Sequence, residues 1–311
     1  MSLRVAVTLE LPDRLRAPAT VEKVAAELDL SPVALDVLCG HLVSLGVLER
    51  ISDQYLTTSY GKNLCAEAEN GLANLLDLNR AAGRAELAFV ELEHSIRTGE
   101  AAYARRYGQD FWADLTANPR LRTAFDQQMT NRFREEIPQV VAGIDWSGFE
   151  TLVDVGGGRG DLLAALLEAN PKLRAQLIDL EATAAQAQTM FEERGLADRV
   201  EVRGGSFFDP LPAGADGYLL VDILHNWDDE NARRILERCA EAAGPSGRIL
   251  AIEAVSGIRA RTEMDLVMLV HFGGRERRVE EFGTLASAAG LILTNATALT
   301  GQRGLLEFRV G

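Results

Sequence analysis

The segment GYLLVDILHNWDDE, residues 217–230, places a histidine directly after an apolar run. The run predicts a buried strand over residues 217–224, with His225 exposed at its carboxyl end. Doubly wound folds bind ligands at this edge of the sheet. A neutral imidazole beside a hydroxyl group can take its proton, which contributes roughly 10²–10⁴-fold to a rate. His225 is therefore our candidate general base, and the alternative is a structural histidine that caps the helix after it.

The residues that follow His225 favour structural roles. Asp228 and Asp229 begin the helical stretch DDENARRILERCAEAAG. Acids in the first turn of a helix complement its dipole, so we expect both to stabilise this helix. We interpret Trp227 as a packing residue.

A glycine-rich loop, DVGGGRG, follows a second apolar run. Glycines permit a tight turn and a close approach to a ligand, and the helix after the loop begins with free N–H groups. The spacing is Asp154-x-Gly156-x-Gly158-x-Gly160, whereas a dinucleotide fingerprint needs Gly-x-Gly-x-x-Gly. This pattern is typical of methyltransferases that use S-adenosylmethionine (SAM).

Two further strand ends supply groups that suit the same cofactor. The run AQLIDL reaches Asp179, whose carboxylate can accept hydrogen bonds from both ribose hydroxyls. The run RVEVRGG is followed by Ser206, which offers a hydroxyl, and by two phenylalanines that offer an aromatic face to adenine. We predict cofactor contacts from Asp154, Gly156, Gly158, Asp179, Leu180, Ser206, Phe207 and Phe208.

Large apolar side chains recur at helical spacing between residues 111 and 133. Packing in a core is the commoner role of such side chains. Because they directly precede the glycine-rich half, some can also line an apolar pocket for an acceptor molecule. We single out Phe111, Trp112 and Met129 for that pocket.

The elements that must position these residues divide the chain into two halves. Helical periodicity prevails up to about residue 145, whereas apolar runs alternate with amphipathic helical stretches from Thr151 onward. The second pattern is typical of a parallel α/β sheet. We therefore predict a mainly helical domain over residues 1–145 and an α/β domain over residues 146–311.

The first half contains a winged-helix pattern. A helix capped by Thr20 is followed by a second helix that opens with Ser31 and Pro32 and ends at Gly46, and LERISDQYLTTSYGK then predicts a hairpin. DNA-binding proteins of this type depend on Lys and Arg for phosphate and base contacts, and the second helix has neither. Packing or dimerisation is therefore a better prediction than DNA binding.

The second half predicts a seven-stranded sheet. Five apolar runs alternate with helices, and a C-terminal hairpin of LILTNATAL and GLLEFRV follows. Six parallel strands and one antiparallel strand are typical of the Rossmann-like class I methyltransferase fold. Dinucleotide dehydrogenases normally lack that hairpin.

Composition excludes several classes of partner. Among its 311 residues the chain has a net charge of -14, which repels nucleic acid and anionic membranes. The three cysteines lack CxxC spacing, so we predict no metal ion, no disulfide framework and a cytoplasmic protein. No apolar run approaches the ~18 residues of a membrane span. The chain opens within what reads as a helix, so we expect a trimmed or unusually short amino terminus.

Several motifs occur in order and with normal spacing, namely DVGGGRG, LIDL, GGSFFDPLP, LHNWDDE, RILAIEA and MDLVMLVHFGGRER. Together they resemble the winged-helix-containing small-molecule O-methyltransferases, which include plant caffeate and flavonoid enzymes and bacterial polyketide-tailoring enzymes. The similarity covers nearly the whole chain. Within the family the chain is most similar to the bacterial aromatic-polyketide branch, and VELEHSIRTGEAAYARRYGQDFW resembles the naphthoate O-methyltransferases.

The resemblance implies specific roles for residues of this chain. SAM would be the methyl donor and S-adenosyl-L-homocysteine the product. His225 matches the family's catalytic base, and Glu253 and Glu276 match the two acids that flank it. Met268 and Phe272 fall where family members contact the acceptor. The resemblance also implies a homodimer in which each subunit helps to close the other's pocket.

Two residues depart from the family's usual pattern. The family usually reads His-Asp-Trp where this chain reads His225-Asn226-Trp227, and an amide cannot supply the charge of an acid. Many family members carry an acid where Ser206 stands, so adenine recognition would depend here on a hydroxyl or on the backbone.

These observations predict a SAM-dependent O-methyltransferase that acts on a phenolic hydroxyl of an aromatic, polyketide-like or naphthoate-like molecule. One alternative is a family member diverted to C-methylation, hydroxylation or decarboxylation, which Asn226 leaves open. A non-catalytic SAM-binding regulator is a further alternative, and the glycine spacing disfavours a nicotinamide oxidoreductase.

Overall fold

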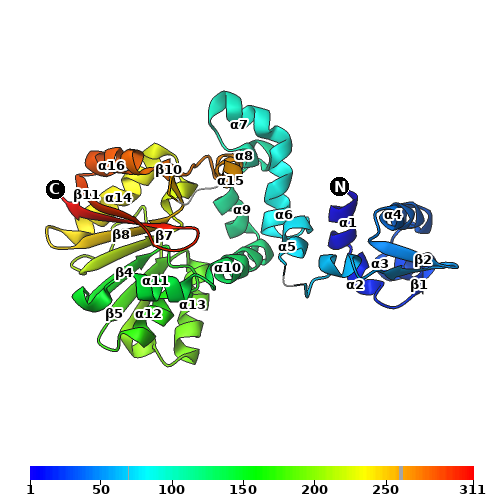
Figure 1. Ribbon diagram of the computed structural model, residues 1–311, viewed down its shortest axis with the longest axis horizontal. Helices are drawn as coiled ribbons and strands as arrows, with labels where there is room; N and C mark the ends of the chain where they lie inside the picture. Colours follow the sequence, from blue (N-terminus) through cyan, green and yellow to red (C-terminus); the bar gives the residue numbers. More distant parts are fainter. Residues whose placement is uncertain (69, 259–261) are drawn as a thin grey trace. The chain divides into compact units, whose positions relative to one another are not determined.

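The computed structural model describes residues 1–68, 70–258 and 262–311 (Figure 1). The chain packs as two compact units, one formed by Met1–Phe89 with Asp114–Phe125 and the other by Val90–Ala113 with Asp126–Gly311. Residues on both sides of position 145 therefore pack in the second unit. The functional division at that position stays a prediction.

The first unit contains the predicted winged helix. Its elements are α1 (Ser2–Thr8), α2 (Leu11–Arg14), β1 (Ala19–Thr20), α3 (Val21–Leu28), α4 (Pro32–Ser44), β2 (Leu48–Ile51), β3 (Gln54–Thr57), η1 (Gly61–Leu64), α5 (Leu72–Leu76) and α6 (Ala81–Glu86). Thr20 caps α3 by accepting from the Lys23 N–H, and Ser31 caps α4 by accepting from the Ala34 N–H, as the sequence predicts. The antiparallel sheet β1-β3-β2 is the wing.

The second unit is built on the predicted seven-stranded sheet. Its strands are β4 (Thr151–Val155), β5 (Arg174–Asp179), β6 (Val200–Gly204), β7 (Gly217–Val221), β8 (Arg248–Glu253), β11 (Leu291–Ala298) and β12 (Gly304–Val310). They lie in the order β11-β12-β8-β7-β4-β5-β6. Only β12 runs antiparallel to its neighbours in this sheet, so the prediction of six parallel strands and one antiparallel strand is confirmed.

The second unit also contains helices, some of which connect the strands of the sheet. They are α7 (Leu92–Thr98), α8 (Ala102–Tyr107), α11 (Ile137–Gly143), η3 (Trp146–Gly148), α12 (Asp161–Ala169), α13 (Glu181–Glu193), η4 (Ala197–Arg199), η5 (Leu224–Asn226), α14 (Asp229–Ala243), α15 (Thr262–Phe272) and α16 (Val279–Ala288). Three further elements cross the boundary between the units, namely η2 (Leu87–Glu91), α9 (Phe111–Ala117) and α10 (Pro119–Phe133). A short parallel pair, β9 (Val255–Ser256) with β10 (Arg277–Arg278), lies outside the main sheet.

The sheet is the middle of three layers. In β7, Tyr218 and Leu220 pack in the core that contains residues of α14 and α16, whereas Leu219 packs in the core that contains residues of α12 and α13. Figure 1 shows α14 and α16 on one face of the sheet and α11, α12 and α13 on the other. Burial on both faces explains why these strands are continuous apolar runs in the sequence.

The fourth strand in sequence is shorter than predicted. We expected it to extend to residue 224, but β7 ends at Val221. Asp222 then adopts a left-handed conformation with φ 53°, and the chain continues as the short 3₁₀ helix η5. The prediction of the strand's end was therefore wrong by three residues.

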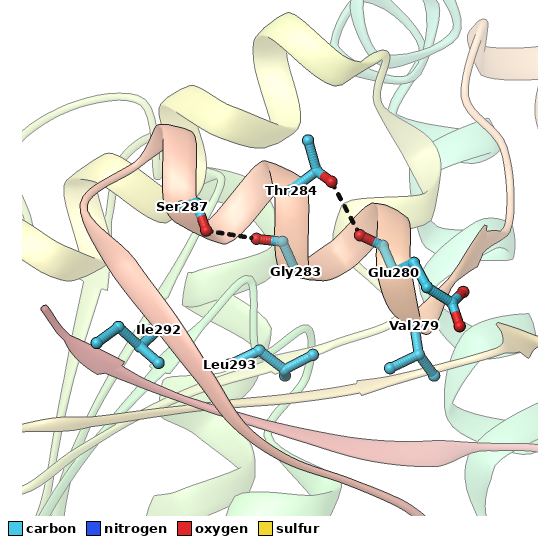
Figure 2. Close-up of a pocket in the computed structure, with 7 residues that line it drawn as sticks. All are labelled: Val279, Glu280, Gly283, Thr284, Ser287, Ile292 and Leu293. Carbon is cyan, nitrogen blue, oxygen red and sulfur yellow. Dashed lines mark hydrogen bonds between the residues drawn. The ribbon is translucent and has the colours of Figure 1, made fainter.

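A shallow groove lies between α16 and β11 (Figure 2). Its walls include Thr284 and Ser287, whose hydroxyls donate to the carbonyls of Glu280 and Gly283 in their own helix. No predicted site residue lines this groove. Within residues 1–68, 70–258 and 262–311, the structure has no helix with the length and apolar character of a membrane span.

Candidate active site

The glycine-rich loop joins β4 to α12. Gly156, Gly158 and Gly160 all have positive φ values, at 75°, 59° and 83°, a conformation that favours glycine. A Cβ atom on Gly158 would meet nothing within 4 Å, so the loop leaves open space at this position. The backbone conformation thus explains the spacing of the three glycines.

Asp179 ties the loop to the end of β5. Its carboxylate accepts from the Gly158 N–H and from the Leu180 N–H, both at 2.8 Å. A carboxylate offers about four acceptor positions, so it retains capacity for ribose hydroxyls. Leu180 is 36% exposed beside it. Left-handed glycines, open space and a carboxylate at a strand end together fit a nucleoside such as that of SAM.

Asp154 lies beneath the loop. A Cβ atom on Gly157 would come 2.6 Å from the Asp154 carboxyl carbon, so glycine is required there as well. Burial raises the pKa of Asp154 to about 7, and the charge of Asp179 adds to the shift. Its contact with the cofactor stays a prediction.

The two phenylalanines after β6 differ in their surroundings. Phe207 lies near the loop, 3.5 Å from the position of a Cβ atom on Gly156. Phe208 packs edge-on against Trp227 at 4.9 Å and lies under the Arg234 guanidinium at 4.8 Å. The Ser206 hydroxyl accepts from the Phe208 N–H at 3.2 Å. We expect Phe207 rather than Phe208 to face the cofactor.

The Glu253 carboxylate shapes the turn that carries His225. Glu253 ends β8, and its Oε1 accepts from the N–H groups of Ile223 and Leu224 at 3.0 and 2.6 Å. These bonds take the place of the ladder bonds that would extend β7. Because a side chain from the adjacent strand satisfies these N–H groups, the chain can leave the sheet early.

His225 and Glu253 form a buried pair. Nδ1 of His225 lies 3.6 Å from Oε2 of Glu253, which is longer than a hydrogen bond. Neither atom has a hydrogen-bond partner among the described residues. His225 is only 6% exposed, so the expectation that it is exposed was wrong, because the turn points its ring into the protein.

Burial favours the uncharged forms of both side chains. It lowers the pKa of His225 to about 4, although the Asp222 carboxylate acts in the opposite direction. It raises the pKa of Glu253 to about 8, and the charge of Asp222 adds to that shift. The imidazole is therefore neutral at physiological pH, which is the form that a general base requires.

Glu276 comes into the same region through the β9–β10 pair. Arg277 lies opposite Val255 in this parallel pair, so the residues just before each strand run side by side. Glu276 is 6% exposed, and its backbone N–H donates to the Asp265 carboxylate at 2.7 Å. Its role as a second acid beside His225 stays a prediction.

Arg277 holds both ends of the His225 turn, and the sequence analysis missed it. Its guanidinium is fully buried and donates to the carbonyls of Leu224 at 2.8 Å and Trp227 at 2.7 Å. It also pairs with Asp229 at 2.8 Å. No spacing distinguishes this arginine from its neighbours in RERR, so only its contacts identify it.

Asp228 and Asp229 stabilise the start of α14, as predicted, and Asp229 also forms ion pairs with two arginines. Asp228 caps α14 by accepting from the Asn231 N–H at 2.8 Å, which confirms its structural role. Asp229 lies in the first turn of α14 and also pairs with Arg275 and Arg277. It therefore anchors the Arg277 contact as well as α14.

Three of the predicted acceptor residues form one aromatic cluster. Trp112 stacks on Phe272 with ring centroids 5.4 Å apart, and Phe111 meets Phe272 edge-on at 5.0 Å. Trp227 joins this cluster to Phe207, at 6.2 Å from Trp112 and 5.9 Å from Phe207. Trp227 is thus a packing residue, as predicted, and it links the predicted acceptor side to the predicted cofactor side.

The two methionines lie on helices around this site. Met268 is 4% exposed on α15, one helical turn before Phe272. Met129 lies on α10 beside Thr130, whose hydroxyl donates to the Asp161 carboxylate at the start of α12. Contacts of these five residues with an acceptor stay predictions.

Two protein-family models match most of the chain. Residues 89–292 match the O-methyltransferase domain, and residues 1–68 match the O-methyltransferase dimerisation domain. The chain belongs to the O-methyltransferase family.

Individual relatives of this O-methyltransferase cover nearly its full length. It is 46% identical to the 2,7-dihydroxy-5-methyl-1-naphthoate 7-O-methyltransferase of Streptomyces carzinostaticus, over 95% of this chain and 90% of that protein. It is 41% identical to the aclacinomycin 10-hydroxylase of Streptomyces purpurascens, over 99% of this chain and 86% of that protein. The O-methyltransferase of neocarzinostatin biosynthesis, solved with S-adenosylmethionine and 2-hydroxy-5-methyl naphthoic acid, has a TM-score of 0.91 at 43% identity and covers 100% of this chain and 95% of that one.

Asn226 has a defined structural role in this O-methyltransferase. Its side-chain amide donates to the Asp222 carbonyl at 2.9 Å and so closes the turn that begins with the left-handed residue. An ionised aspartate could not donate this bond. The amide therefore holds the turn that carries His225, and the charge of an acid at this position is absent.

Proposed function

We propose that this chain is a SAM-dependent O-methyltransferase that methylates a phenolic hydroxyl of an aromatic, naphthoate-like or polyketide-like molecule. One observation carries the proposal. A buried, neutral His225 lies beside Glu253 at the carboxyl end of β7, on the same edge of the sheet as the glycine loop after β4. A base and a nucleoside site on one sheet edge suit methyl transfer to a hydroxyl group.

His225 performs the proton transfer in this proposal. A phenol has a pKa of about 10 and is mostly protonated at neutral pH, which makes it a poor nucleophile. Nδ1 of His225 faces Glu253, so Nε2 is the nitrogen that takes the hydroxyl proton.

The other predicted site residues bind and orient SAM and the acceptor in this proposal. When bound, SAM supplies an activated methyl group and leaves as S-adenosyl-L-homocysteine. Asp179 would hold its ribose, the backbone of Gly156 and Gly158 would approach it closely, and Phe207 would lie by its adenine. The aromatic cluster of Phe111, Trp112 and Phe272 would supply an apolar wall for a flat acceptor. Alignment of hydroxyl and methyl group then supplies much of the rate enhancement.

A diverted reaction is the second candidate. The similar Streptomyces purpurascens protein is named a hydroxylase, which shows that the family supports other chemistry at this level of identity. His225 in this chain favours methyl transfer, because its neutral imidazole can serve as the base that the reaction requires.

We also propose a homodimer in the cytoplasm. The amino-terminal residues match a dimerisation domain, and α4 presents Val33 and Val37, one helical turn apart, at 77% and 71% exposure. Burying such a pair against a second copy would remove apolar surface from water. The three cysteines are free and buried, which suits a reducing compartment.

Calorimetry and a methyl-transfer assay test the function. We expect micromolar binding of S-adenosyl-L-homocysteine and none of NAD. With labelled SAM and hydroxynaphthoates, the product should gain one methyl group, whereas a product that gains one oxygen would support the diverted reaction. His225→Ala should keep the cofactor affinity and lower kcat by roughly 10²–10⁴-fold. Undiminished turnover of this variant, with His94→Ala as control, would remove His225 from the mechanism.

A further inference from the structure

A buried ionic network lies behind the His225 turn. Arg303, in the turn between β11 and β12, donates from Nε to one carboxylate oxygen of Asp222 at 2.8 Å and from Nη2 to the other. Its Nη1 donates to Glu136, and its guanidinium lies over the Phe133 ring at 4.7 Å. Arg303 is 2% exposed and Glu136 is 6% exposed. This two-point contact fixes the Asp222 carboxylate in orientation as well as in position.

The network brings a carboxylate close to the imidazole. One carboxylate oxygen of Asp222, one ring nitrogen of His225 and one carboxylate oxygen of Glu253 all lie within 4.8 Å of one another. Arg303 bonds both oxygens of Asp222, so its guanidinium offsets part of the negative charge of this network. One arginine faces two carboxylates, which leaves the network with a net charge of about one negative unit beside His225.

Asp222 is the acid near His225 that stays ionised. Burial acts to raise the pKa of Asp222, but the guanidinium of Arg303 outweighs it and holds this pKa below its usual value. Burial favours the protonated form of Glu253 instead. The other charged groups that act on His225 are Arg132 on α10, Arg277 in β10 and Arg303 itself, and all three oppose its protonation. The carboxylate that favours the imidazolium is therefore that of Asp222.

We propose that Asp222 is a positioning residue for His225, whose negative charge, held by Arg303, stabilises the imidazolium formed when His225 takes the acceptor's proton. This inference rests on the proposed function. It also accounts for Asn226, because the charge absent from the residue after His225 is supplied by the residue three places before it. The Asn226 amide then closes the turn over the Asp222 carbonyl.

The test combines a spectroscopic titration with kinetics. The chain has four histidines, so ¹⁵N-histidine NMR spectra of the ligand-free protein can follow His225 by itself. An opposite charge at this range shifts a pKa by about one unit or more. Asp222→Asn should therefore lower the titration midpoint of His225 by about one pH unit and reduce its protonated fraction near pH 4.5. We expect kcat to fall roughly threefold to tenfold, because the rate of general-base catalysis changes less than the basicity of the base, here His225.

Matched variants separate charge from structure. Asp228→Asn is the same substitution three residues after His225, at an exposed helix cap that Asn also fills, and should leave the midpoint and kcat unchanged. Asp222→Glu keeps the charge, so its His225 midpoint should lie between those of Asp222→Asn and the wild type. Arg303→Lys should leave the midpoint within a few tenths of a pH unit, because the Lys ammonium keeps a positive charge beside Asp222. Affinity for S-adenosyl-L-homocysteine should change less than about twofold in all of them.

Two results would overturn the inference. One is an Asp222→Asn protein whose His225 titrates as in the wild type, and the other is an equal shift in Asp228→Asn. If Asp222→Asn does not fold, Asp222→Gly removes the same charge, tolerates the left-handed conformation and should lower the midpoint likewise. An unchanged midpoint in that protein counts against the inference. If the wild type transfers no methyl group, the proposed function fails, but the titration still tests the coupling between Asp222 and His225.

Discussion

Gly274 lies against the backbone of the His225 turn. A Cβ atom on Gly274 would come 2.1 Å from the His225 carbonyl oxygen and 2.6 Å from the Asn226 carbonyl carbon. Both neighbours are backbone atoms, so they cannot move aside as a flexible side chain can. The second glycine of HFGGRER is therefore a packing requirement of the His225 turn.

Gly274→Ala should displace this turn. We expect a loss of about 1–3 kcal/mol of stability from overpacking and a decrease in kcat of about 10²-fold from misplacement of His225. Thermal melts and steady-state kinetics measure both, and affinity for S-adenosyl-L-homocysteine should be retained. Gly283→Ala in α16 is the control, because its Cβ would meet only Leu293 at 3.9 Å, and it should stabilise by about 0.5–1 kcal/mol. Wild-type turnover in Gly274→Ala would contradict this account.

At the scale of elements, the turn after β7 is formed by partners from other strands. Glu253 of β8 accepts its N–H groups, and Arg277 of β10 donates to its carbonyls on either side of His225. The apolar run GYLLVDIL alone is consistent with a longer strand, so the strand's end could not be predicted. The seven strands with one antiparallel, the caps of α3 and α4, the acids at the start of α14 and the position of His225 at the sheet edge were predicted correctly.

Arg277→Lys tests the contact made from β10. An ammonium cannot reproduce the planar set of donors, so one carbonyl of the turn should lose its partner. We expect a loss of about 1–3 kcal/mol of stability and a decrease in kcat of at least about tenfold. Differential scanning calorimetry and kinetics with a hydroxynaphthoate measure these effects.

The adjacent Arg278 provides the control for Arg277. It is exposed, and its backbone N–H rather than its side chain bonds Glu281 at 2.8 Å. Arg278→Lys should therefore behave as the wild type. Equal effects of the two substitutions would show that the Arg277 contacts do not position His225.

At the scale of the whole molecule, buried titratable groups set the dependence of stability on pH. Burial raises the pKa of Asp154 to about 7 and that of Glu253 to about 8, so their contribution is full below about pH 4 and is lost as the pH rises through these values. Burial lowers the pKa of His225 and His271 to about 4, so their contribution is full above about pH 6.5 and is lost on acidification. Between about pH 4 and pH 6.5, the stability lost through the two acids as the pH rises is offset by the stability gained through the two histidines.

The ligand-free protein should therefore melt at a higher temperature near pH 6 than near pH 8. Glu253→Gln removes the acid with the higher pKa and should reduce the difference in melting temperature between pH 6 and pH 8. Asp154→Asn should reduce it mainly between pH 6 and pH 7. Thermal melts across this interval measure the effect. A melting temperature that rises from pH 6 to pH 8 would contradict the assignment of uncharged, buried acids.

The sequence by itself determined the α/β sheet, the winged helix, the glycine-rich turn after β4 and the placement of His225 at the carboxyl edge of the sheet. These features follow from hydrophobic period, helix caps and glycine spacing, which are local properties of the chain. Only the tertiary structure decided that β7 ends at Val221, that His225 is buried, and that Arg277 and Arg303 hold its surroundings. Those contacts join residues 29 to 167 positions apart, whose pairing depends on how the sheet and its loops pack, and no local pattern encodes it.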